Sequence, residues 1–366
     1  MGRKCLLAII IVFAMMVVGC NQCQITESYP AKDRETVPNI FDGQASAPPD
    51  GTTSVDVTAK NESTTDETIK RSEVGSMSHG CSKSVVKDEK GSFLVYDGGD
   101  LKVTYTINAS GLFDEEGVGI LIFVDGQPQP YKTSSNDEYR YLHVFYPTDN
   151  VEMTEDFYFI PVTGEAGDTL EIWFANINYP YYSLTNGMRG FAYTSGSVRV
   201  GTRLVMNSSA QDTISVDVQD RVNAVSVTHV DLTSAETSEW TSAQWQERYE
   251  YRMYVNGSQS IYIYNTKEED PVKLRFEVWG NPYVHYGLVF FIDNEPVSIS
   301  EEDRIYFGVN SGQKTVVEVE LDMSGFDGEC VVYAALVPRN WRTADVLTSN
   351  WLDMSQTFYL LDGDQQ

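Results

Sequence analysis

The feature that most constrains the fold is an apolar stretch that the chain contains twice. Residues 117–128 read GVGILIFVDGQP, and residues 285–296 read HYGLVFFIDNEP. Near its end, each copy contains an acidic residue followed by Gly or Asn, at 125–126 and 293–294. These residue types tolerate the positive φ angles of a tight hairpin turn. A short apolar run that ends in such a turn is typical of a buried strand. The repeat therefore predicts one strand and its turn, present in two copies of the same domain.

The segments around the two copies repeat in the same order. Short runs of alternating apolar residues, separated by turn residues at intervals of roughly 8–12 positions, indicate a β-sandwich or barrel. We expect strands at 93–96, 101–107, 118–125, 139–146, 155–162, 169–177 and 191–206, and again at 259–264, 272–279, 286–293, 304–309, 314–321, 330–337 and 356–361.

The sequence thus predicts an all-β fold with two tandem duplicated β-sandwich domains, at 91–206 and 259–366, and with Phe123 and Phe291 at equivalent positions. Residues 207–258 are a connector whose strands we expect to join the second sandwich. In the number and length of their strands the domains resemble immunoglobulin-like sandwiches, although they lack the Cys…Trp…Cys pattern of that family.

The N-terminus has the anatomy of a secretory signal. Two basic residues precede an uncharged apolar stretch at 5–19, which is shorter than the ~20 residues that usually span a membrane. The residues Val17-Val18-Gly19-Cys20 resemble the lipobox of bacterial lipoproteins. The resemblance implies cleavage of a signal peptide, residues 1–19, lipid on the sulfur of Cys20, and a place on the extracytoplasmic face of the cell membrane. An uncleaved membrane anchor is the alternative.

Residues 20–90 are rich in Ser, Thr, Asp, Glu and Pro, and such a composition does not bury enough apolar surface to offset the entropy of ordering. We expect a lipidated, disordered tether there. The net charge of −27 is carried mostly by residues after 90. Folded domains with this charge repel DNA, RNA and anionic lipid headgroups, which excludes nucleic-acid binding and leaves neutral glycans, peptides, cations and basic proteins as partners.

The sequence contains no motif of a hydrolase triad, a zinc site, a phosphate-binding loop or a dinucleotide-binding fold. Of the four histidines, His79 lies in the tether, His143 and His229 lie in expected strands as structural imidazoles, and His285 lies in a loop. We therefore predict that the chain is not an enzyme and holds no cofactor or metal. A pair of carboxylates for glycoside hydrolysis stays open, because only spatial separation identifies such a pair.

The cysteines and acidic clusters suggest neither a disulfide framework nor a metal site. Beyond Cys20, the mature chain keeps Cys23, Cys81 and Cys330, an odd number without metal-ligand spacing. Unpaired thiols are favoured over a Cys81–Cys330 bridge. Three acidic clusters match no calcium-binding loop and are interpreted as solvated turns, at 114–116, 268–270 and 301–303.

Aromatic residues in loops are the best candidates for binding. Successive antiparallel strands reverse direction, so loops 108–117 and 178–190 are expected at one end of the first sandwich, and loops 280–285 and 338–350 at the corresponding end of the second. The candidate ligand-binding residues in or beside these loops are Tyr179, Tyr181, Tyr182, Trp279, Tyr283 and Trp341. Their rings can stack on sugars or anchor a protein partner, or they can instead close the core as buried side chains.

Together these observations predict a non-enzymatic, lipid-anchored bacterial surface protein that binds a glycan or a wall-associated protein. The alternatives are a hydrolase of polysaccharide or peptidoglycan, and a structural lipoprotein whose duplicated domains are spacers.

Overall fold

The computed structural model describes residues 76–89, 91–110, 117–181, 199–210, 214, 216, 218–238, 249–259, 263–266, 271–299, 304–323, 328–340, 352–355 and 357–362. The predicted signal peptide, Cys20 and most of the predicted tether lie outside these residues. All of the described residues belong to one compact unit. Within the described ranges, no helix is long and apolar enough to cross a membrane.

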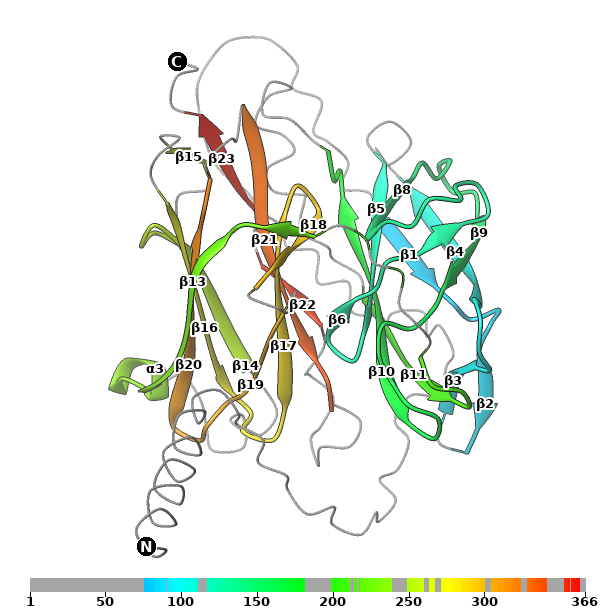
Figure 1. Ribbon diagram of the computed structural model, residues 1–366, viewed down its shortest axis with the longest axis horizontal. Coiled ribbons are helices and arrows are strands. Elements are labelled where there is room, and N and C mark those ends of the chain that lie inside the picture. Colours follow the sequence, from blue (N-terminus) through cyan, green and yellow to red (C-terminus); the bar gives the residue numbers. More distant parts are fainter. Residues whose placement is uncertain are drawn as a thin grey trace, which may run out of the picture. The chain divides into compact units, whose positions relative to one another are not determined.

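The fold is all-β, as the sequence predicts, and its strands form four sheets (Figure 1). Two of these sheets pack into a first β-sandwich around a core that includes Tyr105, Phe157 and Phe174. One sheet has the order β1 (Ser76–Gly80), β4 (Leu101–Ser110), β9 (Met153–Phe159) and β7 (Lys132–Thr133). The other has the order β2 (Val86–Asp88), β3 (Gly91–Tyr96), β11 (Arg199–Met206), β10 (Thr169–Asn178), β5 (Val118–Val124) and β6 (Gln127–Pro128), and β8 (Leu142–Phe145) also pairs with β5.

The second sandwich has the same plan around a core that includes Phe276, Phe290 and Val317. One sheet has the order β13 (Val222–Asp231), β20 (Gln313–Leu321), β16 (Val272–Gly280) and β14 (Tyr249–Val255). The other has the order β12 (Gln219–Asp220), β18 (Glu295–Ser298), β17 (His285–Ile292), β21 (Glu329–Pro338), β23 (Phe358–Asp362) and β15 (Ile263–Thr266). Beside this path, β19 (Ile305–Gly308) pairs with β17, and β22 (Asp353–Met354) pairs with β21.

The two copies of the repeated stretch form equivalent strands, β5 and β17. Phe123 pairs with Pro128 on one side and with Trp173 on the other. Phe291 pairs with Pro296 and with Tyr333 in the same way. The parallel pair β3–β11 likewise has a counterpart in the parallel pair β15–β23. The predicted equivalence of Phe123 and Phe291 is therefore confirmed in the strand pairing.

The repeated stretch is apolar throughout because both of its faces are buried. Every residue of β5 is buried. Side chains at even positions, such as Ile120 and Ile122, face the core of the first sandwich. Leu121 and Phe123 point the other way, into a third core shared by the two sandwiches. An antiparallel strand with one solvated face would alternate apolar and polar residues, and this strand cannot do so.

The predicted turns form with the backbone angles expected from their residues. Asp125 and Gly126 have φ angles of 48° and 81°, and Asp293 and Asn294 have φ angles of 51° and 68°. Residues 256–257 also form a turn, with φ angles of 47° and 81°. Among the described residues after this last turn, Ser258 forms a bridge with Val255 at the end of β14, and β15 then pairs with β23 in the opposite sheet.

The predicted tether range, 20–90, includes two strands, which corrects the expected start of the first sandwich. β1 pairs with β4, and β2 pairs with β3. His79, expected in the tether, contacts the hydroxyl of the buried Tyr105, and Cys81 is itself buried in the first core. Composition missed this segment because an edge strand takes its stability from the backbone groups and core of its neighbour, which local polarity does not reveal.

The connector behaves largely as expected. β12, β13 and β14 pair with β18, β20 and β16, so its strands join the second sandwich. A one-turn helix, α3 (Ser234–Ser238), follows β13. At 212–218, the described positions 214, 216 and 218 form no strand.

Candidate functional site

The strand register brings the predicted loops together at one end of each sandwich. Asn178 pairs with Val118, and the amide of Tyr179 donates to the carbonyl of Gly117 at 3.2 Å. In the second sandwich, the amide of His285 donates to the side-chain oxygen of Asn340 at 2.8 Å, and the Asn340 amide donates to the carbonyl of Tyr283 at 3.0 Å. The grouping by strand direction is confirmed for the described parts of these loops.

The six candidate aromatics do not share one environment. Tyr181 and Tyr283 are 65% and 56% exposed. Tyr179 packs partly buried against the first core, and Trp279 is only 2% exposed. Tyr182 and Trp341 lie outside the described residues.

Trp279 is buried inside the sheet rather than exposed at its rim. β16 continues to Gly280, so Trp279 pairs with Glu250 and Lys314 inside the sheet and is not part of the loop. The guanidinium of Arg252 lies 4.8 Å from the centre of its ring. For Trp279, the alternative of a buried side chain describes the observed position.

Another exposed tyrosine, Tyr146, acts electrostatically on the Tyr181 phenol, and we call this pair the tyrosine rim. Tyr146 is 57% exposed and directly follows β8. Partial burial of the phenol raises the pKa of Tyr181, and the nearby positive charge of Arg140 acts in the opposite direction. Sequence analysis missed Tyr146, although an aromatic residue just before Pro147, where a strand must stop, was a usable signal.

The segment that carries Tyr181 is held by the second sandwich. The side-chain amide of Asn294 donates to the carbonyl of Pro180 at 2.7 Å. The buried hydroxyl of Tyr333 donates to the side-chain oxygen of Asn294 at 3.2 Å. The carboxylates of Asp293 and Glu295 also act on the Tyr181 phenol. The rim therefore combines exposed rings, fixed backbone and nearby charged groups.

The repeated turn of the first sandwich contacts the second sandwich in a related way. Arg339 forms an ion pair with Asp125 at 2.5 Å, and its guanidinium lies 3.9 Å from the centre of the Tyr306 ring. Gly287 permits this approach, because a Cβ atom there would lie 2.6 Å from the carbonyl oxygen of Gly126.

The two sandwiches also share a buried core. The rings of Phe123 and Phe291 meet edge to face with their centres 6.1 Å apart. The indole of Trp173 donates to the carbonyl of Pro338 at 3.2 Å. Such a packed contact fixes the surface on which the tyrosine rim lies.

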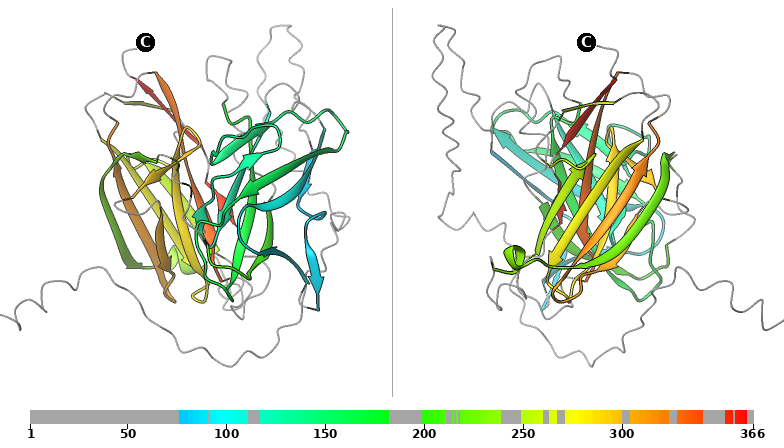
Figure 2. Two further views of the ribbon diagram at one scale, coloured as in Figure 1. Left: turned by 45° about the vertical axis from the view of Figure 1, so that its right-hand side comes forward. Right: turned by 90° about the vertical axis from the view of Figure 1, so that its left-hand side faces the viewer.

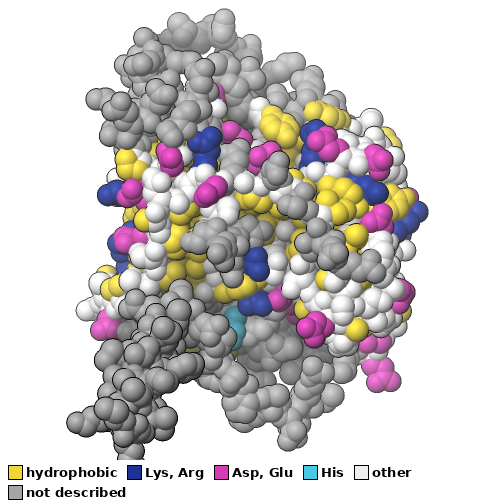
Figure 3. All heavy atoms as spheres, viewed as in Figure 1, with side chains coloured by type: hydrophobic (Ala, Val, Ile, Leu, Met, Phe, Trp, Pro, Cys, Tyr) yellow, Lys and Arg dark blue, Asp and Glu magenta, His cyan; other side chains and the backbone are white. Residues whose placement is uncertain are grey.

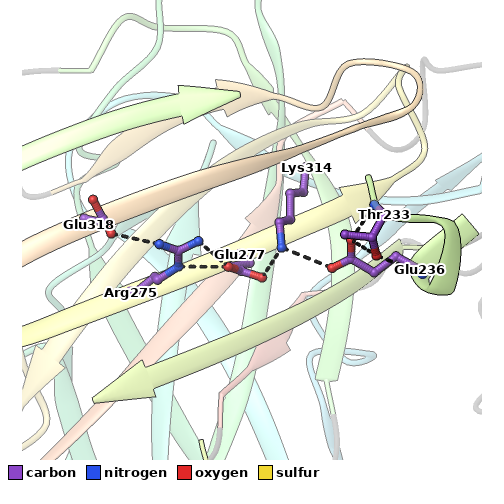
Figure 4. Close-up of polar contacts among 6 residues, drawn as sticks. All are labelled: Thr233, Glu236, Arg275, Glu277, Lys314 and Glu318. Atoms are coloured by element: carbon purple, nitrogen blue, oxygen red, sulfur yellow. Dashed lines mark hydrogen bonds and ion pairs between the residues drawn. The ribbon is translucent and has the colours of Figure 1, made fainter. Parts of the chain in front are cut away.

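A group of charged side chains lies on the outer face of the second sandwich (Figure 4). The carboxylate of Glu277 is buried and contacts Arg275 at 2.6 Å and Lys314 at 2.8 Å. Lys314 also contacts Glu236 of α3 at 3.1 Å, and Arg275 contacts Glu318 at 3.0 Å. A buried carboxylate is tolerated when it is paired and hydrogen-bonded in this way.

This charged group fastens α3 to the sheet. Thr233 and Glu236 exchange hydrogen bonds in a capping box, at 2.9 Å and 3.3 Å. Burial raises the pKa of Glu236, but hydrogen bonds from Thr233 and Lys314 outweigh it, so the net pKa lies below the usual value. Since each of these charges has a partner, we assign the group a structural role.

The remaining titratable candidates are mostly structural as well. The ring of His143 bonds to the carbonyl of Tyr131 at 2.7 Å, and burial lowers its pKa, which confirms the predicted structural imidazole. Burial, with a smaller effect of Arg339, lowers the pKa of His285. Cys81 and Cys330 are buried free thiols, as predicted, and burial raises the pKa of Cys81 to about 12.

In the part of the chain that is described, no group of three His, Cys, Asp or Glu side chains is placed to hold a metal ion. The three acidic clusters of the sequence lie outside that part. On the face shown in Figure 3, acidic side chains are scattered among basic and apolar ones and do not gather into a single patch.

No protein-family model matches the sequence, and no curated protein matches it. Among solved structures, the chain is similar to the C-terminal domain of the AgI/II polypeptide BspA of Streptococcus agalactiae, with 9% identity and a TM-score of 0.22 over 78% of this chain and 100% of that one. The C-terminal domain of AspA, an antigen I/II-family protein of Streptococcus pyogenes, matches with 11% identity and a TM-score of 0.21 over 78% of this chain and 98% of that one. Fibronectin(III)-like modules of CbhA from Clostridium thermocellum match with 7% identity and a TM-score of 0.20 over 75% and 91%. With scores this low, these proteins say nothing about what this chain binds.

Proposed function

We propose that the chain is a non-enzymatic, lipid-anchored protein of the bacterial cell surface that binds a glycan of the cell wall through the tyrosine rim. The observation that carries the proposal is the pair of exposed, electrostatically coupled tyrosines, Tyr146 and Tyr181, of which Tyr181 lies on a segment held by the second sandwich. Isolated exposed aromatics are common, whereas two on a fixed backbone form a ready surface for stacking.

The chemistry around the rim suits a sugar. Carbohydrates present flat apolar faces edged by hydroxyl groups, and tyrosine rings offer the matching apolar surface at a low cost in side-chain entropy. Arg140 and Glu295, both close enough to act on the Tyr181 phenol, supply a donor and acceptors for hydroxyl groups. The net charge of −27 favours a neutral or cationic wall component over an anionic one.

Binding assays with the full chain test the rim. The variant Tyr146→Ala with Tyr181→Ala is expected to lose retention on purified cell-wall glycan, with an unchanged melting temperature because both rings are exposed. The matched control is Val86→Ala, which removes an exposed side chain on the edge strand β2. Retention of the double variant equal to wild type would refute the rim. If the double variant instead loses binding to a wall-associated protein and keeps its binding to glycan, the partner of the rim is a protein.

Other loop aromatics are proposed as additional contacts. Tyr283, exposed on the corresponding loop of the second sandwich, is tested by Tyr283→Ala in the same assay. Tyr182 and Trp341 extend the proposal to residues outside the described part. If substitution of Tyr283, Tyr182 or Trp341 reduces binding and the double substitution at Tyr146 and Tyr181 does not, the contact surface lies outside the tyrosine rim.

The membrane anchor is proposed from the residues Val17-Val18-Gly19-Cys20 alone. Two or three acyl chains on Cys20 would hold the protein firmly, since each buried methylene contributes ~0.8 kcal/mol. Labelled palmitate should enter the wild-type protein and not Cys20→Ala, which should leave the membrane fraction. Continued labelling of that variant would contradict lipid attachment at Cys20 and leave the rim proposal untouched.

A further inference from the structure

β13 is an unusually open edge strand. The other edge strands of the described sheets have between two and seven residues, whereas β13 has ten, none of which is buried. In the right-hand view of Figure 2 it runs, in green, along the edge of the sheet that also contains β20, β16 and β14. Natural edge strands are usually short, or carry Lys or Pro, because an open edge invites pairing with another strand. The sequence of β13, VNAVSVTHVD, contains neither.

The backbone of β13 has a regular set of N–H and C=O groups that point away from its neighbour β20. The amide of Leu232 donates to the carbonyl of Gly312, toward β20, at 3.1 Å. Hydrogen-bonding groups alternate along an antiparallel strand, so those of odd-numbered residues from Val225 to Asp231 point away from β20. A register shift between Val222 and Ala224 interrupts the pattern, which leaves Ala224–Asp231 as the regular edge.

The apolar layer of the sandwich is also open along this edge. Val227 pairs with Val317, a fully buried core residue, and therefore lies on the core side of the sheet. Its side chain is nevertheless 41% exposed, and Val230 on the other face is 42% exposed. A strand added beside β13 would cover both backbone and apolar side chains.

We propose that this edge pairs antiparallel with β13 of a second copy of the chain, joining two four-stranded sheets into one. A two-fold axis beside Thr228 sets Val227 opposite His229 and Val225 opposite Asp231 of the other copy. In both copies, all the outward-pointing backbone N–H and C=O groups from Val225 to Asp231 then form hydrogen bonds across the interface. No carboxylate of one copy faces a carboxylate of the other. The strand fits itself in length and charge, since Asp231 is its only acidic residue.

The overall charge predicts how this dimer responds to salt. Two chains with a net charge of −27 repel one another, and one pair of edge strands is a small interface. The association is therefore weak and depends on concentration. Salt shortens the screening length from about 8 Å at 0.15 M to about 3 Å at 1 M, so the dimer strengthens as salt is added.

Sedimentation velocity of the purified full chain in mild detergent, at increasing protein and salt concentration, tests the proposal. Wild type is expected to shift from monomer to dimer. Val227→Pro removes an outward amide, Val227→Lys places a charge on the edge, and both should stay monomeric. Val86→Lys, the same change at an exposed valine of β2, should dimerise like wild type.

Amide hydrogen exchange provides an independent readout. In the dimer, the amides of Val225, Val227, His229 and Asp231 should exchange more slowly than in the monomer, whereas the inward amide of Thr228 should not change. The proposal is overturned if wild type stays monomeric at every protein and salt concentration. It is equally overturned if Val227→Lys dimerises as wild type does, even where Val227→Pro lowers the melting temperature.

Discussion

The contact between Phe123 and Phe291 predicts that the two repeats are energetically coupled. Both side chains are fully buried, and their rings meet edge to face with centres 6.1 Å apart. Phe→Ala in a core costs about 3–5 kcal/mol, because apolar burial is lost and a cavity remains. An edge-to-face pair contributes ~0.5–1.5 kcal/mol beyond area burial. Each single variant should therefore lose about 3–5 kcal/mol, and the double variant should lose less than the sum by ~0.5–1.5 kcal/mol.

Equilibrium unfolding in urea measures this coupling as a double-mutant cycle. The matched control cycle pairs Phe123→Ala with Phe276→Ala, because Phe276 is equally buried but lies in the separate core of the second sandwich. That control should be additive within about 0.5 kcal/mol. If the Phe123–Phe291 cycle is additive to the same degree, the two rings do not share a core and the inferred packing of the repeats is wrong.

Three further predictions concern the charged group and the close approach of the repeats. Lys314→Met should cost about 3 kcal/mol in urea unfolding, the low end of the range for a broken buried ion pair, because a guanidinium still contacts the buried carboxylate; a loss below about 1 kcal/mol would contradict this. The pKa of Glu236 is lower in the folded state than the usual 4.5, so its contribution to folding stability is complete above pH 4.5 and is lost as the pH falls through the lowered value. The melting-temperature difference between wild type and Glu236→Gln should therefore shrink from pH 7 to pH 3. A constant difference would refute a stabilising role for the Glu236 carboxylate. Gly287→Ala should cost about 1–3 kcal/mol, since its Cβ would meet the backbone of Gly126 at 2.6 Å, whereas Gly308→Ala, with its nearest atom at 3.6 Å, avoids that clash; equal losses would refute the close approach.

The strands were predictable because apolar and polar residues alternate along them, or because every residue is apolar. Both patterns follow from which faces of the strand are buried. The repeated stretch was informative since both of its faces are buried, which leaves no polar position to blur the pattern. The two turns were predictable from residue types that accept positive φ angles. Loop grouping followed from strand direction alone, which needs no knowledge of side-chain contacts.

The misses have a different physical origin. Trp279 lies in an expected strand, but the choice between an exposed and a buried ring stayed open, because burial depends on neighbours that only folding supplies. β1 lies in a polar segment and is recruited by the free edge of β4. Tyr146 and Tyr181 come together through folding, 35 positions apart in the sequence, so no local pattern pairs them.

The shared core also determines where binding can occur. Sheets built on β5 and β17 are buried on both sides, by their own sandwich and by the other repeat. On the remaining outer face of the second sandwich, the charges around Glu277 are already paired with one another. Strand ends and strand edges of the described residues can be contacted without breaking these interactions. The tyrosine rim is such an end and β13 is such an edge, which leaves both surfaces free to be used at the same time.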